Sequence, residues 1–213
     1  MSDPEKEQPK IYLITPSEFE LSSFGEQLGA VLDIFEIPCV RLRLATDDTD
    51  TIGRTADVLR DICHQREVPI VIDSHFRLVE THGLDGVHLP DGAKRIRYIR
   101  EELGTDAIIG SYCGASRHNG MTAAETGADY VSFGPMSDTG LGDGTLAEFE
   151  TFEWWSQVVE VPVVAEGAIT LETAEKLALV TDFIALGSEV WNAEEPPEAM
   201  IRAYLARLSS ALR

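Results

Sequence analysis

The sequence has few cysteines, and it lacks the apolar segments of exported and membrane proteins. Its three cysteines, Cys39, Cys63 and Cys113, are widely spaced and form no CxxC pair. This spacing disfavours a disulfide framework and is typical of a reduced, cytoplasmic protein. Residues 1–10 are charged and contain no apolar core of a signal peptide. No apolar run reaches the roughly 18 residues that a membrane helix needs.

Basic residues are also scarce. The chain has 17 Lys and Arg against 37 Asp and Glu, which gives a formal net charge of -20. We expect no nucleic-acid partner, because a polyanion would be repelled. A phosphorylated ligand would need donors placed close to it, because the field of the whole chain is unfavourable.

The apolar pattern alternates between strands and helices along the whole chain. The predicted strands cover 10–16, 37–44, 68–74, 85–90, 107–113, 127–135, 161–167 and 182–186. The predicted helices cover 17–36, 50–66, 77–82, 93–103, 119–126, 148–160, 171–180 and 196–212. About eight alternations at spacings of roughly 25 residues predict a (β/α)8 TIM barrel. We expect one domain over residues 1–213, with residues 1–9 disordered.

An open, doubly wound sheet is the alternative architecture. It would need only about six such units, and no GxGxxG follows the first predicted strand, which disfavours a dinucleotide site. Two helix ends carry local signals. Ser17 is a predicted N-cap in a capping box with Glu20, and Gly127 is a predicted C-terminal cap.

In a TIM barrel the chemistry lies at the C-terminal ends of the strands. Gly167 and the pair Gly187 and Ser188 follow the seventh and eighth predicted strands, where backbone N–H groups often bind phosphate. The alternative is that these glycines only end the strands. Arg41 and Arg43 point to one face of the second strand. They are predicted either to bind an anion at the barrel mouth or to pair with buried acids such as Asp73.

Other titratable residues lie at strand ends. Asp73 and Asp91 follow neighbouring strands and could share one Mg²⁺, or they could be ordinary turn and capping residues. His88 lies inside an apolar strand and is predicted to be a core histidine. His75, His118 and Cys113 are candidate acid–base groups, although their spacing assigns no nucleophile–base pair.

Four segments together resemble one known family. They are DGVHLP at 85–90, GADYVSFGP at 127–135, VPVVAEGAI at 161–169 and DFIALGSEVW at 182–191. In this order and spacing they resemble the thiamine-phosphate synthase family, which includes thiazole tautomerase relatives. The resemblance implies a TIM barrel that joins hydroxymethylpyrimidine diphosphate to thiazole phosphate, with Mg²⁺, and releases pyrophosphate.

The resemblance also implies roles for individual residues. Arg43 would bind the diphosphate, Thr139 would contact the diphosphate or the pyrimidine, and His75 is a further catalytic candidate. The predicted phosphate-binding residues are Arg41, Gly167, Gly187 and Ser188, and the predicted Mg²⁺ ligands are Asp73 and Asp91. We expect a small phosphorylated substrate and keep a homodimer as a candidate assembly.

Several positions depart from the family pattern, among them Glu166, which replaces the first glycine of a Gly-Gly pair. Ala45 and Gly142 stand where the family has lysines, and Ser74 and Ala93 stand where it has metal-binding aspartates. Loss of one stabilising donor typically costs roughly 100- to 1,000-fold in rate, so a degraded synthase activity is predicted. The alternatives are a thiazole-phosphate tautomerase that uses His75, His118 or Cys113, and a non-catalytic protein that binds a phosphorylated ligand.

Overall fold

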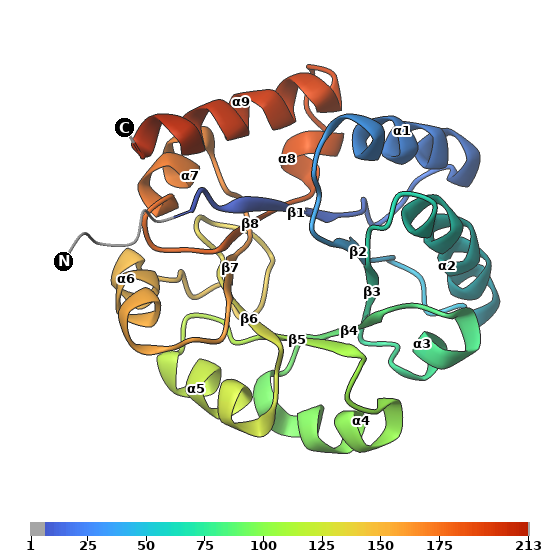
Figure 1. The fold of residues 1–213 in the computed structure, drawn as a ribbon, viewed down its shortest axis with the longest axis horizontal. Coiled ribbons are helices and arrows are strands. Elements are labelled where there is room, and N and C mark those ends of the chain that lie inside the picture. The colour runs from blue at the N-terminus through green and yellow to red at the C-terminus, as the bar shows by residue number, and fades with distance from the viewer. Residues whose placement is uncertain (1–6, 213) are drawn as a thin grey trace.

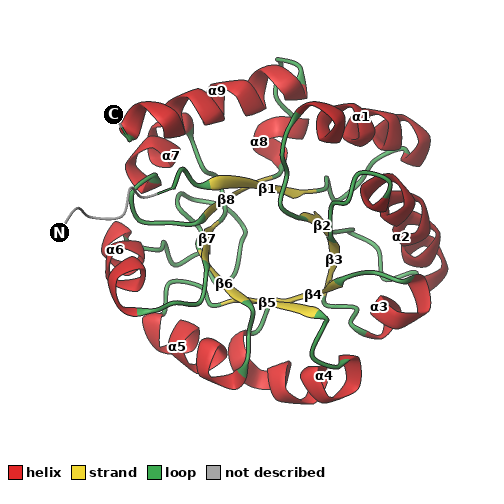
Figure 2. Cartoon of the chain, viewed as in Figure 1, coloured by secondary structure: helices red, strands yellow, loops and turns green. Residues whose placement is uncertain are grey.

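Eight short parallel strands form a closed barrel, and helices surround it on the outside (Figures 1 and 2). The computed structural model describes residues 7–212. Each strand pairs with the next along the chain, and β1 pairs with β8 to close the barrel. The predicted (β/α)8 TIM barrel is therefore confirmed.

The elements follow the predicted order, with strands that are shorter than predicted. The strands are β1 Lys10–Ile14, β2 Val40–Leu42, β3 Ile70–Asp73, β4 Gly86–Leu89, β5 Ile108–Tyr112, β6 Tyr130–Phe133, β7 Val163–Ala165 and β8 Phe183–Leu186. The helices are α1 Leu21–Ile34, α2 Thr49–His64, α3 Arg77–His82, η1 Gly92–Arg95, α4 Ile96–Leu103, α5 Arg117–Thr126, α6 Phe149–Val158, α7 Leu171–Leu177, α8 Ser188–Trp191 and α9 Pro197–Ala211. No helix within residues 7–212 is long and apolar enough to cross a membrane.

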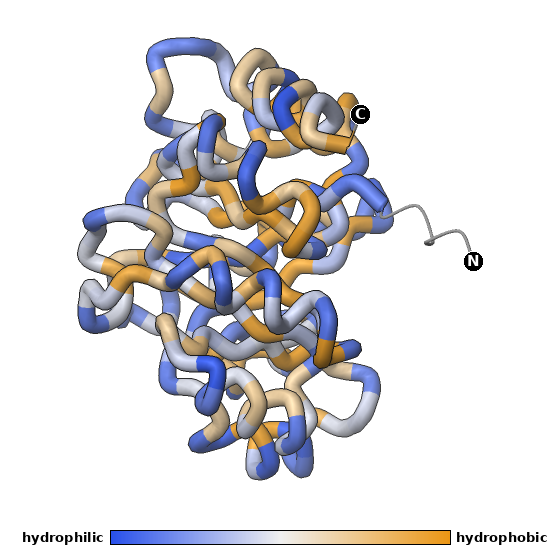
Figure 3. The backbone as a smooth tube through the Cα atoms, turned by 90° about the vertical axis from the view of Figure 1, so that its left-hand side faces the viewer, coloured by the Kyte–Doolittle hydropathy of each residue, from blue (hydrophilic) through white to orange (hydrophobic). Residues whose placement is uncertain are grey.

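The buried apolar residues form two clusters because successive side chains of a strand point to opposite faces. The larger cluster packs the outward face of the strands against the helices. The smaller one lies within the barrel and consists of Tyr12, Ile14, Cys39, Val71, Tyr130, Val164 and Ala185. Hydrophobic segments accordingly run through the interior, with hydrophilic turns on the outside (Figure 3). Polar side chains continue the inner cluster toward the C-terminal ends of the strands.

Gly134 explains the Gly-Pro pair that ends the sixth predicted strand. A Cβ atom at this position would lie 2.0 Å from the carbonyl oxygen of Glu166. The backbones after β6 and β7 therefore approach more closely than any side chain would allow. This contact brings the loop after β6 over the end of β7.

Of two local capping predictions, the structure corrects one and confirms the other. Ser17 does not cap α1, because its carbonyl accepts a hydrogen bond from Ala45 N (2.9 Å) and holds it in the loop beside β2. Glu20 is the N-cap instead, and its carboxylate accepts from the N–H groups of Ser22 and Ser23. Gly127 is the C-terminal cap of α5 as predicted, with φ of 105°.

The predicted disorder of residues 1–9 falls largely outside the described residues, which begin at residue 7. Gln8 is ordered against the last helix, because its side-chain amide donates to the carbonyl of Leu205 (3.3 Å). A helix that the sequence did not predict, α8, follows directly after β8.

Candidate active site

Among the hollows formed by residues 7–212, three at the C-terminal ends of the strands contain predicted site residues. The β7–β8 cavity, of about 300 Å³, is lined by Ile14, Arg43, Thr139, Gly140, Leu141, Glu166, Gly167, Ala168, Ala185, Gly187, Ser188 and Glu189. The β2–β3 cavity, of about 250 Å³, is lined by Leu42, Arg43, Leu44, Asp47, Ile52, Ile72, Asp73, Ser74 and His75. The β4–β5 groove, of about 830 Å³, includes Asp91, Ala93, Cys113, His118, Gly142 and Asp143 among its lining residues.

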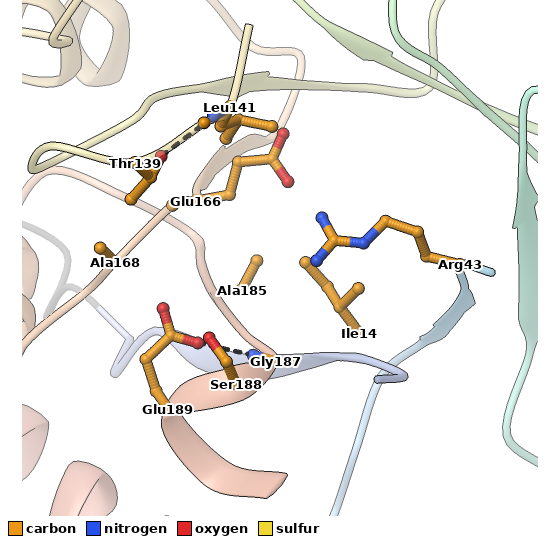
Figure 4. A pocket seen from close by; sticks show the side chains of 12 residues that line it. Ile14, Arg43, Thr139, Leu141, Glu166, Ala168, Ala185, Gly187, Ser188 and Glu189 are labelled. Atoms are coloured by element: carbon orange, nitrogen blue, oxygen red, sulfur yellow. Dashed lines mark hydrogen bonds between the residues drawn. The ribbon is translucent and has the colours of Figure 1, made fainter. Parts of the chain in front are cut away.

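Arg43 borders both the β7–β8 and the β2–β3 cavities. Its backbone is fixed by Thr15, whose hydroxyl accepts from Arg43 N (3.0 Å) and donates to Arg43 O (3.1 Å). Its guanidinium forms no ion pair with any carboxylate of residues 7–212 and points into the β7–β8 cavity (Figure 4). A half-buried cation without a partner is available to bind an anion.

Thr139, Gly167, Gly187 and Ser188 meet Arg43 at the β7–β8 cavity, although they come from three different loops. The loop after β6 is joined to the loop after β7 by a hydrogen bond from Met136 N to Gly167 O (2.8 Å). Thr139 closes a tight turn in the former loop, since its hydroxyl accepts from Leu141 N (3.1 Å; Figure 4). Phosphate binding by these residues stays a prediction.

Arg41 has different surroundings from Arg43. It is 2% exposed, and its guanidinium lies 3.2 Å from Asp73 Oδ1 and 2.7 Å from Glu166 Oε2. Of the two roles that the sequence left open for Arg41, the observed contacts match pairing with buried acids. Removing two carboxylates from water costs free energy, and only close contacts with a cation offset this cost.

Glu166 connects Arg41 to a chain of hydrogen bonds inside the barrel. Its carboxylate accepts from Ser132 Oγ (2.9 Å) and lies 3.9 Å from His88 Nε2. His88 Nδ1 in turn lies 2.9 Å from the hydroxyl of Tyr130, which lies 2.8 Å from that of Tyr12. The prediction that His88 belongs to the core is therefore confirmed.

Burial shifts the pKa of two groups in and beside this network, His88 and Asp73. It lowers the pKa of His88 well below the usual range, and the Arg41 charge lowers it further. Burial also raises the pKa of the Asp73 carboxyl, against the opposing effect of Arg41. Tyr12, Ser132 and Tyr130 were not among the predicted site residues, although their alternation with core residues on inward faces was a usable signal.

Asp73 and Asp91 do not share a hollow. Asp73 borders the β2–β3 cavity with His75 and Arg43, whereas Asp91 borders the β4–β5 groove and lies 3.3 Å from Arg95. Within residues 7–212, no group of three or more His, Cys, Asp or Glu side chains is arranged to hold a metal. Two carboxylates that each lie beside an arginine, in separate hollows, do not fit a shared Mg²⁺ site.

The remaining acid–base candidates lie apart from Arg43. Cys113 and His118 line the β4–β5 groove, and burial raises the pKa of the Cys113 thiol to about 12, which keeps it protonated. Gly142 has φ of 63°, and a Cβ atom there would lie 2.6 Å from the hydroxyl of Tyr112. The structure thus explains why this loop carries glycine where a lysine was expected.

Comparison with known proteins identifies the family. The sequence pattern of the family described as "Thiamine monophosphate synthase" matches residues 11–190. A thiamine-phosphate synthase of Rhodospirillum centenum is 40% identical over 197 residues, covering 92% of this chain and 95% of that protein. The enzyme of the same name from Erythrobacter litoralis is 35% identical over 208 residues, covering 95% and 96%.

A solved structure has the same fold. Thiamine phosphate pyrophosphorylase from Pyrococcus furiosus superposes with a TM-score of 0.81 at 24% identity, covering 96% of this chain and 97% of that one. The sequence matches extend from the first strand to the helix after the last strand, and they include all the loops that form the hollows. The chain belongs to the thiamine monophosphate synthase family.

Proposed function

We propose that this protein joins hydroxymethylpyrimidine diphosphate to thiazole phosphate, which yields thiamine phosphate and pyrophosphate. Family membership supports the reaction. The observation that carries the proposal is Arg43, whose guanidinium pairs with no carboxylate of residues 7–212 and lies between two cavities at the barrel mouth. A dissociating diphosphate requires a cation at this kind of position.

The reaction breaks the bond between the pyrimidine methylene carbon and the diphosphate oxygen. The bonding electrons leave with the diphosphate, and the thiazole nitrogen then donates its lone pair to the pyrimidine methyl cation. Arg43 would stabilise the departing diphosphate, and the Thr139 hydroxyl would donate a further hydrogen bond to it. The rest of the acceleration comes from holding the two rings in line.

The buried network supports this geometry. The Arg41 guanidinium and the Glu166 carboxylate form an ion pair of 2.7 Å beneath the barrel mouth. Because of this pair, Arg41 is not free to move toward the departing diphosphate. Glu166 also lines the β7–β8 cavity, where its fixed position would orient the thiazole. Preorganised polar groups of this kind need no rearrangement during the reaction.

Mg²⁺ belongs to the activity that the family resemblance implies. Asp73 borders the β2–β3 cavity together with Arg43 and could be the one carboxylate ligand of Mg²⁺, with substrate phosphates and water as the other ligands. Bound there, Mg²⁺ would neutralise charge on the diphosphate. We assign no such role to Asp91, because it lies in the separate groove.

The reaction would take place in a reducing compartment, which we propose to be the cytoplasm. Cys39, Cys63 and Cys113 are all free thiols and all buried. The substrates would be small phosphorylated molecules, in keeping with the size of the two cavities.

Turnover of the purified protein with both substrates and Mg²⁺ tests the proposal, with pyrophosphate release as the measurement. We expect Arg43→Ala to lower kcat/KM by roughly 100- to 1,000-fold, because one stabilising donor for the leaving group is lost. Arg43→Lys should recover only part of this loss, because an ammonium lacks the guanidinium fork.

Arg97→Ala is the matched control. Arg97 is exposed on α4 and lines none of the three hollows, so its removal should leave kcat/KM unchanged. The proposal is wrong if the wild-type protein releases no pyrophosphate above background. The assignment of Arg43 is wrong if Arg43→Ala and Arg97→Ala behave alike.

A further inference from the structure

The Glu189 carboxylate lies between the turns after β7 and β8, where a substrate phosphate would be expected to bind. It is the second residue of α8, and its carboxylate accepts hydrogen bonds from two backbone N–H groups. Oε2 accepts from Gly187 N (2.9 Å), and Oε1 accepts from Ile169 N (3.2 Å). The two donors belong to the loops after β8 and β7, which are separated in sequence by α7 and β8.

The position of this carboxylate is inside the β7–β8 cavity. Glu189 lines the cavity together with Gly167 and Ser188, and Figure 4 shows its side chain beside Ser188 with the hydrogen bond to Gly187. Backbone N–H groups after the last strands are what TIM barrels commonly use to bind phosphate. Here the Glu189 carboxylate accepts hydrogen bonds from two such N–H groups.

The charges around the cavity also disfavour a phosphate at these N–H groups. Arg43 is the one basic residue among the lining residues, and it lies across the cavity from Glu189 (Figure 4). Glu166 contributes a second carboxylate to the lining. A phosphate at the Gly187 and Ile169 N–H groups would therefore meet like charges, and the one lining cation within residues 7–212, Arg43, lies across the cavity, so binding there is unfavourable in a partly desolvated site.

We propose that Glu189 competes with the phosphate of the thiazole substrate for the Gly187 and Ile169 N–H groups. The protein consequently has little preference for thiazole phosphate over the same thiazole with a free hydroxyl. The hydroxyl is neutral, so it has no like charge to meet and can donate a hydrogen bond to the Glu189 carboxylate. This inference rests on the proposed function for the identity of the thiazole, and it makes Glu189 a specificity-determining residue.

Direct binding tests the inference independently of turnover. Calorimetry would compare thiazole phosphate with the thiazole alcohol for the wild-type protein, Glu189→Ala and Glu189→Gln. We expect the two wild-type Kd values to agree within about threefold. Glu189→Ala should bind thiazole phosphate at least about tenfold more tightly, because two N–H donors become free for a charged acceptor. Its Kd for the alcohol should change by about twofold or less.

Glu189→Gln tests whether the effect of Glu189→Ala comes from the lost charge or from a change in the fold. It keeps one acceptor oxygen and the side-chain shape but removes the charge, so it should shift the preference toward the phosphate in the same direction as Glu189→Ala. Glu194→Gln is the matched control, since Glu194 is exposed and its substitution makes the same change in net charge.

Two results would overturn the inference. One is a wild-type protein that already prefers thiazole phosphate by more than tenfold, and the other is an unchanged phosphate Kd in both Glu189 variants. Pyrophosphate release is measured in parallel. Absence of turnover with a clear decrease in the thiazole phosphate Kd of the Glu189 variants would reject the proposed function and retain the role of Glu189.

Discussion

Arg41 and Arg43 are the same residue type at neighbouring positions, yet they have different surroundings and different roles. Both alternate with apolar residues, Arg41 within β2 and Arg43 just after it, and the sequence left two roles open for each. Arg41, deeper in the barrel, lies between Asp73 and Glu166, whereas Arg43 at the strand end has no carboxylate partner within residues 7–212. The alternation was readable from the sequence, but the partners were not, because Glu166 lies 125 residues away in sequence.

Replacement of Arg41 is expected to destabilise the protein strongly. Arg41→Met would leave the buried Glu166 carboxylate without its ion-pair partner, which costs about 3–5 kcal/mol. The measurement is the free energy of unfolding in urea. Arg207→Met removes an exposed pair with Glu175 and should cost about 1 kcal/mol or less. Similar losses for the two variants would contradict the structural role of Arg41.

His88 is expected to make stability depend on pH in the mildly acidic range. Its pKa is lowered by burial, so below about pH 6.5 the unfolded chain binds a proton that the folded chain does not. Unfolding is then favoured as the pH falls, and stability decreases by up to about 1.4 kcal/mol per pH unit.

Urea unfolding of the wild-type protein and His88→Gln between pH 5 and pH 7.5 measures this effect. The slope of unfolding free energy against pH should be smaller for His88→Gln, whose amide can still hydrogen-bond Tyr130. Comparison of slopes removes the contribution of Asp73, which is common to both proteins. Equal slopes would show that His88 is not the group responsible.

At the scale of elements, periodicity predicted more than capping signals did. Every predicted strand and helix has a counterpart in the structure, because burial on one or both faces imposes a repeat on the sequence. Ser17 had the spacing of a capping box, yet its carbonyl is bound by Ala45 N from the loop after β2. Such a long-range contact overrides a local signal. Helix α8 has only four residues, too few for any periodicity to show.

The loop after β6 offers a test of why glycine stands at position 142. Gly142→Lys would place a Cβ atom in a left-handed conformation, 2.6 Å from the Tyr112 hydroxyl. We expect it to cost about 1–3 kcal/mol in unfolding free energy. Gly140→Lys adds the same charge to the same loop, but no atom lies within 4 Å of its Cβ position.

Gly140→Lys should therefore change stability by about 0.5 kcal/mol or less. Because Gly140 lines the β7–β8 cavity with Arg43, its lysine should also lower the KM for the diphosphate substrate. Equal unfolding free energies for the two variants would mean that the loop relaxes freely around Gly142.

At the scale of the whole molecule, the number of repeats was enough to predict closure of the barrel. The ends of neighbouring strands, however, do not all open into one hollow. Asp73 and Asp91 were expected to converge, but they line separate hollows, and each lies beside an arginine. Loop conformation and side-chain pairing decide this, and neither follows from strand order.

The net charge of -20 is expected to slow the arrival of an anionic substrate. A rise in ionic strength from 10 mM to 150 mM shortens the screening length from about 30 Å to about 8 Å. The repulsion between the chain and the pyrimidine diphosphate is then weakened, so kcat/KM for this substrate should increase by about threefold or more. The measurement is pyrophosphate release at constant free Mg²⁺.

The uncharged thiazole alcohol is the control, because its Kd should stay constant over the same range of salt. The opposite result, a kcat/KM that falls as salt is added, would mean that the local field of Arg43 attracts the substrate more strongly than the remaining charges repel it. The sign of the salt effect therefore decides whether the field at the barrel mouth or the field of the whole chain controls substrate capture.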